Sequence, residues 1–136
     1  MYLLDTNVIS EVRKPKPHGA VLAWLESVDD ESLFLSAVTL GELQAGIELT
    51  RRQDRVKAAE IEAWLDHIAA SQQILPMDGP AFRECARLMN AKPDRLLEDA
   101  MIAATARIHR LTVVTRNTRD FEPFEVGLLN PFLPRT

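Results

Sequence analysis

Short apolar runs alternate with longer segments of mixed character along this 136-residue chain. Each run is too short for a helix and ends at a polar residue or a proline, which is typical of strands buried inside a sheet. Such runs occur at residues 2–5, 33–36, 74–75 and 112–115, and a fifth is expected at residues 126–129. The pattern therefore predicts a sheet of four or five short strands.

The segments between these runs carry apolar residues at the spacing of a helix. They predict helices at residues 8–12, 20–28, 38–50, 54–72, 78–90 and 96–109. Thr6 or Asn7 is expected to cap the first helix, and a short polar link joins the third to the fourth as an αα-hairpin. Strands that alternate with helices predict an α/β domain whose parallel sheet is covered on both faces.

Composition narrows the class of protein. A chain of this length buries about two-thirds of its unfolded surface, so residues 1–136 are expected to form one domain. The single Cys85 excludes disulfide scaffolds and Cys-rich zinc sites. No apolar run approaches the roughly 20 residues of a membrane helix, and the first residues lack a secretory signal, so we expect a cytoplasmic protein with no membrane partner. A net charge of −4 argues against a broad basic surface for nucleic acid.

Polar side chains follow the first and fourth predicted strands. Asp5 ends the first strand, and Asn117 and Asp120 lie in the loop after the fourth. Because ligands of parallel sheets bind outside the carboxyl ends of the strands, both loops are expected to open onto one site.

Two further acids lie on predicted helices, at about 100° per residue. Glu42 shares its helix face with small and apolar residues as far as Leu49, and Asp99 shares its face with Ala103. Glu98 falls on a different stripe from Asp99. We therefore expect Glu42 and Asp99 to point inward.

Carboxylates that face a core need a cationic partner, because burying an unpaired charge costs several kcal/mol. No inward Lys or Arg stands out, and clustered oxygen ligands favour Mg²⁺ or Mn²⁺ over zinc. Taken singly, Asp99 is also explained as an acid at a helix start, and Asp5 as a turn residue that accepts backbone N–H groups. Convergence of Asp5, Glu42, Asp99 and Asp120 instead predicts a metal site.

Basic and hydroxyl side chains are expected around this site. The basic side chains are candidate contacts for a polyanionic substrate, although each is also an ordinary surface charge: Arg13, Lys14, Lys16, Arg116 and Arg119. The hydroxyls of Thr6, Ser36 and Thr115 stand at strand ends, where they orient water or phosphate or simply cap a turn.

These residues resemble the PIN-domain ribonucleases, in particular the VapC-type toxins of bacterial toxin–antitoxin pairs, including the FitB-like branch. The matching segments are residues 3–10, 35–36 with 41–43, 98–100 with 102–106, and 111–121. Each segment is short, but together they span the chain in the order of the family.

The resemblance implies a PIN-like three-layer α/β/α domain with a mainly parallel sheet and a protruding αα-hairpin. It also implies a Mg²⁺- or Mn²⁺-dependent endoribonuclease that is neutralised by an antitoxin, with operator DNA bound only through that antitoxin. Asp5, Glu42 and Asp99 become the core metal ligands. Many relatives have an acid where this chain has Asn117, so Asp120 is taken as ligand or water-holder. Asn117, like Asn7, is taken as a polar support.

A homodimer, within a larger toxin–antitoxin assembly, is expected from one apolar stripe. Ile61, Trp64, Leu65 and Ile68 share a face of the second hairpin helix, and Trp64 is a typical interface anchor. The alternative is that this stripe covers the sheet of its own chain.

Two other functional classes fit the sequence less well. A non-catalytic interaction module would not need all of the acids. An aspartyl-phosphate phosphatase expects a second Asp two positions after the first, where this chain has Asn7. No P-loop segment is present.

Overall fold

The structure is a computed structural model that describes residues 1–134. Its strands are β1 (Tyr2–Leu4), β2 (Leu33–Ser36), β3 (Gln73–Leu75), β4 (Thr112–Val114) and β5 (Leu128–Leu129). They form one sheet in the order β3-β2-β1-β4-β5, and every neighbouring pair is parallel. The predicted parallel sheet is therefore confirmed, with β1 at its centre and β4 beside it.

The helices alternate with the strands along the chain. They are α1 (Thr6–Val12), α2 (Gly19–Glu26), α3 (Ala37–Arg51), α4 (Arg55–Ser71), α5 (Gly79–Met89), α6 (Leu97–His109) and α7 (Thr118–Phe121). Short 3₁₀ turns are η1 (Asp30–Ser32), η2 (Asp94–Leu96) and η3 (Glu122–Phe124). The helix α7 was not expected, because its four residues are too few to show a helical pattern. Its last residue, Phe121, is fully buried and anchors the turn in the core.

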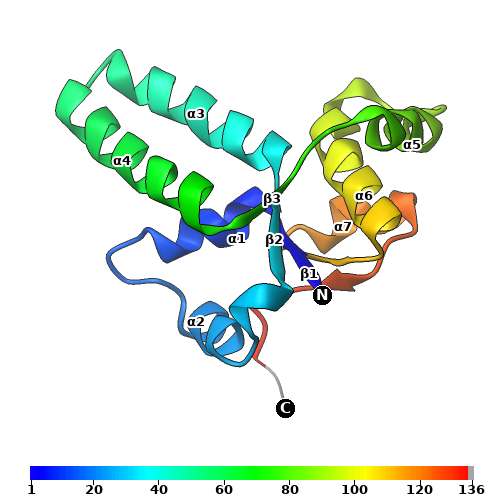
Figure 1. Cartoon of the computed structure of the whole chain (residues 1–136), viewed down its shortest axis with the longest axis horizontal. Helices are drawn as coiled ribbons and strands as arrows, with labels where there is room; N and C mark the ends of the chain where they lie inside the picture. The colour runs from blue at the N-terminus through cyan, green and yellow to red at the C-terminus, as the bar shows by residue number, and fades with distance from the viewer. Residues whose placement is uncertain (135–136) are drawn as a thin grey trace.

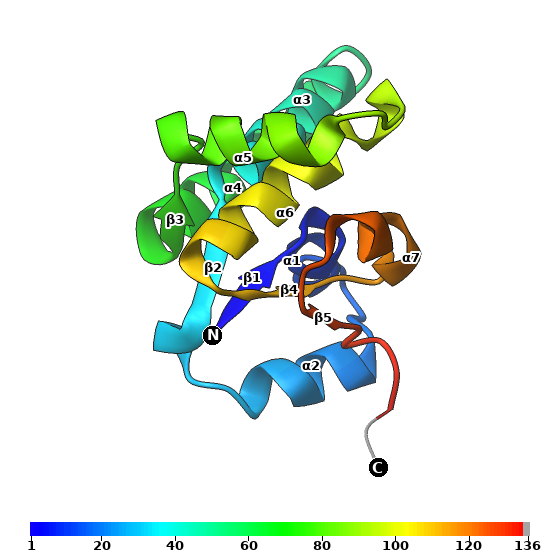
Figure 2. The ribbon, with the colours of Figure 1, turned by 90° about the vertical axis from the view of Figure 1, so that its right-hand side faces the viewer.

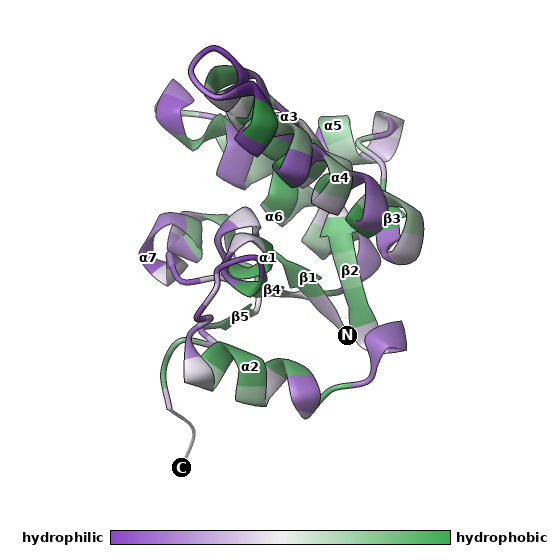
Figure 3. Ribbon diagram, turned by 90° about the vertical axis from the view of Figure 1, so that its left-hand side faces the viewer, coloured by the Kyte–Doolittle hydropathy of each residue, from purple (hydrophilic) through white to green (hydrophobic). Residues whose placement is uncertain are grey.

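The helices cover both faces of the sheet, which gives the expected three layers. Leu3 packs in the cluster formed by α5, α6 and α7, whereas Leu4 packs in the cluster formed by α1 and α2. Adjacent strand residues point to opposite faces, so these two leucines bury both sides of β1. Figure 2 shows α6 on one side of the sheet and α2 on the other, and Figure 3 shows apolar residues on the strands between them.

The predicted αα-hairpin consists of α3 and α4 and extends away from the sheet (Figure 1). Its own small core contains Ile47, Ala58 and Leu65. Trp64 packs against this core and against the cluster of α1 and α2, and the Arg13 guanidinium lies 6.0 Å from the centre of its ring. The apolar stripe of α4 therefore packs against its own chain, as the alternative expected, and the homodimer stays a prediction.

Caps fix where the first helices begin. Asp5, rather than Thr6 or Asn7, is the N-cap of α1, and its carboxylate accepts the Thr6 N–H. Ser36 caps α3 by accepting the Val38 N–H, so the capping alternative for this hydroxyl is confirmed. Both caps stand at the carboxyl edge of the sheet.

Across residues 1–134, no helix combines the length and the apolar character that crossing a bilayer requires.

Candidate functional site

Asp5 is held rigidly at the end of the central strand. It is 5% exposed, and its two carboxylate oxygens accept three hydrogen bonds. One oxygen accepts the Thr6 N–H at 2.8 Å, and the other accepts the Thr115 hydroxyl at 2.8 Å and the Asn7 amide at 3.1 Å. Burial nevertheless raises the pKa of Asp5, and the charge of Asp120 adds to the rise.

The side chains of Asn7 and Thr115 tie the ends of β1 and β4 together. The Asn7 amide also lies 3.3 Å from the Thr115 hydroxyl, and its carbonyl oxygen accepts the Arg116 N–H at 3.1 Å. The Thr115 hydroxyl oxygen accepts the Asn117 N–H at 3.0 Å. Thr115 and Asn7 therefore orient Asp5, whereas Asn117 contributes its backbone and keeps an exposed side chain.

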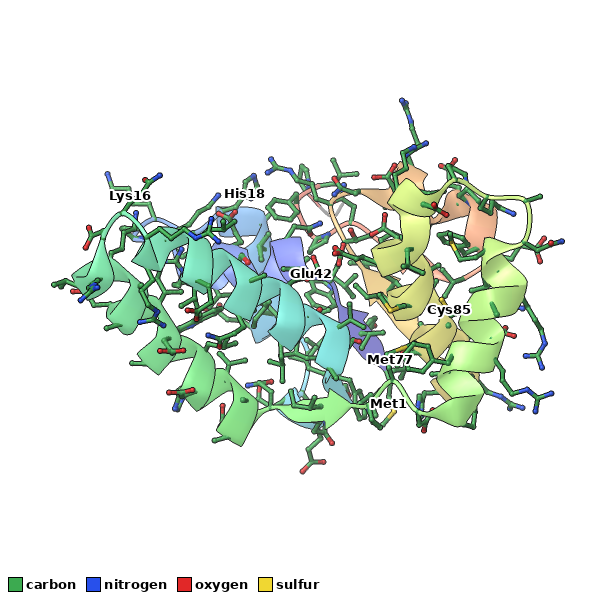
Figure 4. All side chains as sticks on the ribbon, turned by 90° about the horizontal axis from the view of Figure 1, so that it is seen from above. Met1, Lys16, His18, Glu42, Met77 and Cys85 are labelled. Atoms are coloured by element: carbon green, nitrogen blue, oxygen red, sulfur yellow. The ribbon has the colours of Figure 1, made fainter. Side chains whose placement is uncertain are left out.

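Glu42 is half-buried on α3, where that helix faces α6 (Figure 4). Burial raises its pKa to about 7, and the charges of Glu98 and Asp5 contribute, while a hydrogen bond with Thr6 acts in the opposite direction. The predicted inward face was wrong, because Leu49 on that face is 60% exposed and the buried side carries Ile47. Glu42 instead lies at the edge of a second contact, which α3 makes with α6.

Asp99 is half-buried at the start of α6. Its predicted face is confirmed, since Ile102, Ala103 and Ala106 are all buried. Burial raises the pKa of Asp99 to about 6, and the charges of Asp5 and Asp120 contribute most after burial. Helix α6 therefore brings Asp99 to the end of β1.

Glu98 belongs to this group, which the sequence analysis missed by placing it on another stripe. Glu98 is exposed, although Thr105 on the same stripe is fully buried. The negative charge of Glu98 contributes most, after burial, to the raised pKa of Glu42. Helical periodicity within α6 gave no signal for this pairing, which depends on α3 lying across from it.

Five carboxylates thus gather at the carboxyl edge of the sheet, and we call them the carboxylate site: Asp5, Glu42, Glu98, Asp99 and Asp120. None of them forms an ion pair within residues 1–134, although other acids of the chain do. Over the same residues, no three His, Cys, Asp or Glu side chains already stand close enough to hold a metal ion. The donor set of unpaired, mutually repelling oxygens fits a hard divalent cation in charge and ligand type.

The predicted basic contacts are scattered. Lys14 pairs with Glu11 at 2.9 Å, and the Arg116 guanidinium lies 4.3 Å from the Phe132 ring centre. Figure 4 shows Lys16 toward the far end of the molecule from Glu42. Arg119 is exposed beside Asp120 on α7.

Comparison with known proteins identifies the fold and its relatives. The PIN domain family matches residues 2–125. The chain is 38% identical to the toxin FitB of Neisseria gonorrhoeae over 97% of this chain and 99% of FitB. It is 39% identical to the VapC ribonuclease Y4jK of Sinorhizobium fredii over 98% and 99%. The solved structure of FitAB bound to an IR36 DNA fragment has a TM-score of 0.81, with 36% identity over 100% of this chain and 99% of that one.

Proposed function

Since the chain belongs to the PIN domain family, we propose that it is a metal-dependent endoribonuclease and the toxin of a toxin–antitoxin pair. One observation carries the proposal: five carboxylates meet at one sheet edge without an ion-pair partner among residues 1–134. Relatives named as toxin and as ribonuclease, each covered over nearly their whole length, support the same activity.

Asp5, Glu42, Asp99 and Asp120 are the residues proposed to hold Mg²⁺ or Mn²⁺, with Glu98 beside them. A divalent ion bound there lowers the pKa of its water and neutralises charge on the phosphate as the phosphodiester bond is hydrolysed. The raised pKa values of Glu42 and Asp99 support this assignment, because a bound cation would relieve the repulsion that contributes to them.

The surrounding polar residues orient the site. Thr115 and Asn7 hold one oxygen of Asp5, so its other oxygen keeps a defined direction. The Thr6 hydroxyl donates to the Thr39 hydroxyl at 3.1 Å, which fixes α1 against α3. Arg116 and Arg119, in the segment after β4, are the basic residues best placed to contact RNA phosphates.

The proposed partners follow from the relatives. FitAB, a toxin–antitoxin complex solved with DNA, supports an antitoxin partner and contact with operator DNA through that antitoxin. With RNA as the proposed substrate, we propose that the protein acts in the cytoplasm. Homodimerisation stays a prediction, and exposed apolar residues lie at the end of the hairpin, where Leu49 and Val56 are 60% and 70% exposed, and on other elements of the chain, such as Phe82 of α5.

Incubation of the purified chain with a defined RNA tests the proposal. We expect cleavage in Mg²⁺ or Mn²⁺, none in EDTA, and recovery when the metal is restored. Asp5→Asn, prepared in parallel, should be inactive and so exclude contaminating nuclease. Equal cleavage by wild type and Asp5→Asn, or none by a folded wild type with either metal, would favour a non-catalytic interaction module instead.

A further inference from the structure

A concave region lies at the opposite end of α6 from the carboxylate site. It is a cavity of about 950 Å³ between the start of α5, the end of α6 and residues 125–127. Figure 2 looks toward α6 as it runs diagonally between α5 and the sheet. Four arginines line this cavity, and we call it the arginine cavity: Arg83, Arg87, Arg107 and Arg110.

Two of these arginines form hydrogen bonds and ion pairs within the protein. Arg107 donates to Glu84 at 2.8 Å and to the backbone carbonyls of Phe124 and Glu125 at 3.1 and 2.6 Å. Arg87 also pairs with Glu84, at 3.0 Å. Both oxygens of Glu84 are therefore occupied.

The other two arginines are available to a ligand. Arg83 and Arg110 are exposed, and neither forms an ion pair with any residue from 1 to 134. The remaining acid of the lining is Glu125, whose backbone carbonyl accepts from Arg107. The cavity therefore presents two unpaired guanidinium groups beside a neutralised cluster.

The backbone at Arg110 has an unusual conformation for an arginine. Its φ of 57° and ψ of 46° are left-handed, at the helix C-terminal position where glycine is usual. The lining also contains Glu125, at φ 50°. A side chain in this conformation costs stability, so its presence points to a use outside the fold.

We propose that the arginine cavity binds phosphate groups of the RNA strand, several nucleotides from the bond that is cut. This inference rests on the proposed function and extends it to a second RNA contact. Asp99 and Arg110 lie near opposite ends of α6, about 16 Å apart at ~1.5 Å per residue. An RNA strand that reaches both ends of the helix is held in register by the cavity.

Charge and geometry favour RNA over other occupants. The guanidinium fork matches phosphate oxygens in pairs. A chain with a net charge of −4 repels a polyanion overall, so a local basic cavity supplies the attraction that the rest of the surface lacks. An acidic partner protein or a second copy of the chain would have to bind the same two arginines, so either would compete with RNA for the cavity.

Direct binding tests the cavity without catalysis. A fluorescent 30-nucleotide single-stranded RNA is titrated in EDTA with wild type and with the double variant Arg83→Ala/Arg110→Gly. We expect the variant to bind at least tenfold more weakly, with the slope of log Kd against log salt reduced by about 1.4, at roughly 0.7 per phosphate contact. Arg55→Ala removes an exposed arginine from the start of α4 and should stay within twofold of wild type.

Cleavage assays separate this inference from the proposed function. In Mg²⁺, the double variant should raise KM for the long RNA but not for a tetranucleotide too short to reach the cavity. If the wild type cleaves no RNA, the proposed nuclease function is wrong. The titration in EDTA then still tests whether the arginine cavity binds RNA. Unchanged RNA binding by the double variant overturns the inference. So does a variant that changes only the oligomeric mass or only the affinity for an antitoxin.

Discussion

Acidic side chains lie in opposite environments near the two ends of α6. At its start, Glu42 and Asp99 face other carboxylates, and burial together with their repulsion raises their pKa values to about 7 and about 6. Toward its end, Glu84 sits between Arg107 and Arg87, and hydrogen bonds from these arginines hold its pKa below the usual range. The ionised form of a carboxyl group is therefore destabilised near the start of α6 and stabilised near its end.

This difference separates a structural acid from a functional one. Glu84 ties α5 to α6, so the fold itself explains it. The carboxylate site opposes folding at neutral pH, and its presence needs a reason outside the fold. The paired acid also serves as an internal control, because a carboxyl-to-amide change can be made beside either end of α6.

The largest expected effect is loss of cleavage when the carboxylate site is altered. Asp99→Asn and Glu42→Gln should each lower RNA cleavage in Mg²⁺ by about 10³-fold, roughly 4 kcal/mol of transition-state stabilisation. Both variants should keep their folded circular dichroism spectrum, because neither side chain has an ion-pair partner in residues 1–134.

Glu84→Gln is the matched control for these two variants. It should cleave a tetranucleotide too short to reach the arginine cavity like wild type but unfold more easily, by about 1 kcal/mol, since it weakens two ion pairs. Cleavage within tenfold of wild type by Asp99→Asn or Glu42→Gln would show that the two ends of α6 do not differ in function.

The second effect is on stability without metal. The folded-state pKa values of Glu42 and Asp99 lie above their ordinary values of 4.5 and 3.8, so the folded state binds more protons than the unfolded state between about pH 4 and pH 7. The free energy of unfolding in EDTA should therefore fall as pH rises through this window, by about 2 kcal/mol after allowance for partial solvent exposure.

Melting curves in EDTA from pH 5 to pH 8 measure this slope. Asp99→Asn should flatten it and melt above wild type at pH 8, and Glu98→Gln should flatten it through its neighbour Glu42. Glu84→Gln should leave the slope unchanged in this range, because the pKa of Glu84 is lowered and its contribution is lost only at lower pH. A wild-type slope of zero would remove the electrostatic basis of the carboxylate site.

These contrasts also show how far the sequence predicts the molecule. Short apolar runs predict the parallel strands correctly. The positions of the strand ends predict that Asp5 and the segment with Asp120 lie close together. Asp99 followed from periodicity because α6 is buried against the sheet. Glu42 was found for the wrong reason and Glu98 was missed, because the face of one helix does not reveal which other helix lies across from it.

Scattered surface residues were harder still to place. Arg13 lies over Trp64 and Lys14 pairs with Glu11, and neither contact has a periodic signal in the sequence. The stripe around Trp64 looked like an interface because an apolar helix face is equally consistent with an interior and an exterior partner. The surface that this stripe contacts is determined by how the hairpin packs against the rest of the chain.

Mg²⁺ should reverse the pH trend. At pH 8, 10 mM Mg²⁺ with a Kd near 1 mM would stabilise the folded state by about 1.4 kcal/mol, and the gain should be smaller at pH 6, where the site holds more protons. Differential melting against NaCl of equal ionic strength isolates the specific part. Glu42→Gln should lose most of this gain and Glu84→Gln should keep it. Equal shifts in Mg²⁺ and NaCl would reduce the effect to general screening.

The smallest expected effect concerns the other end of α6. Arg110→Gly should raise the free energy of unfolding by up to about 1 kcal/mol. Glycine avoids the roughly 1–2 kcal/mol cost of a left-handed residue, but it also increases the conformational entropy of the unfolded chain, which offsets part of the gain. Arg83→Gly is the matched comparison, since Arg83 lines the same cavity from inside α5, where glycine should destabilise by about 1 kcal/mol. Urea unfolding in EDTA at pH 7 measures both. Opposite signs would show that Arg110 is retained at a cost to the fold, as a binding role requires. If Arg110→Gly destabilises as Arg83→Gly does, the Arg110 side chain supports folding, and its conformation no longer argues for a ligand in the arginine cavity.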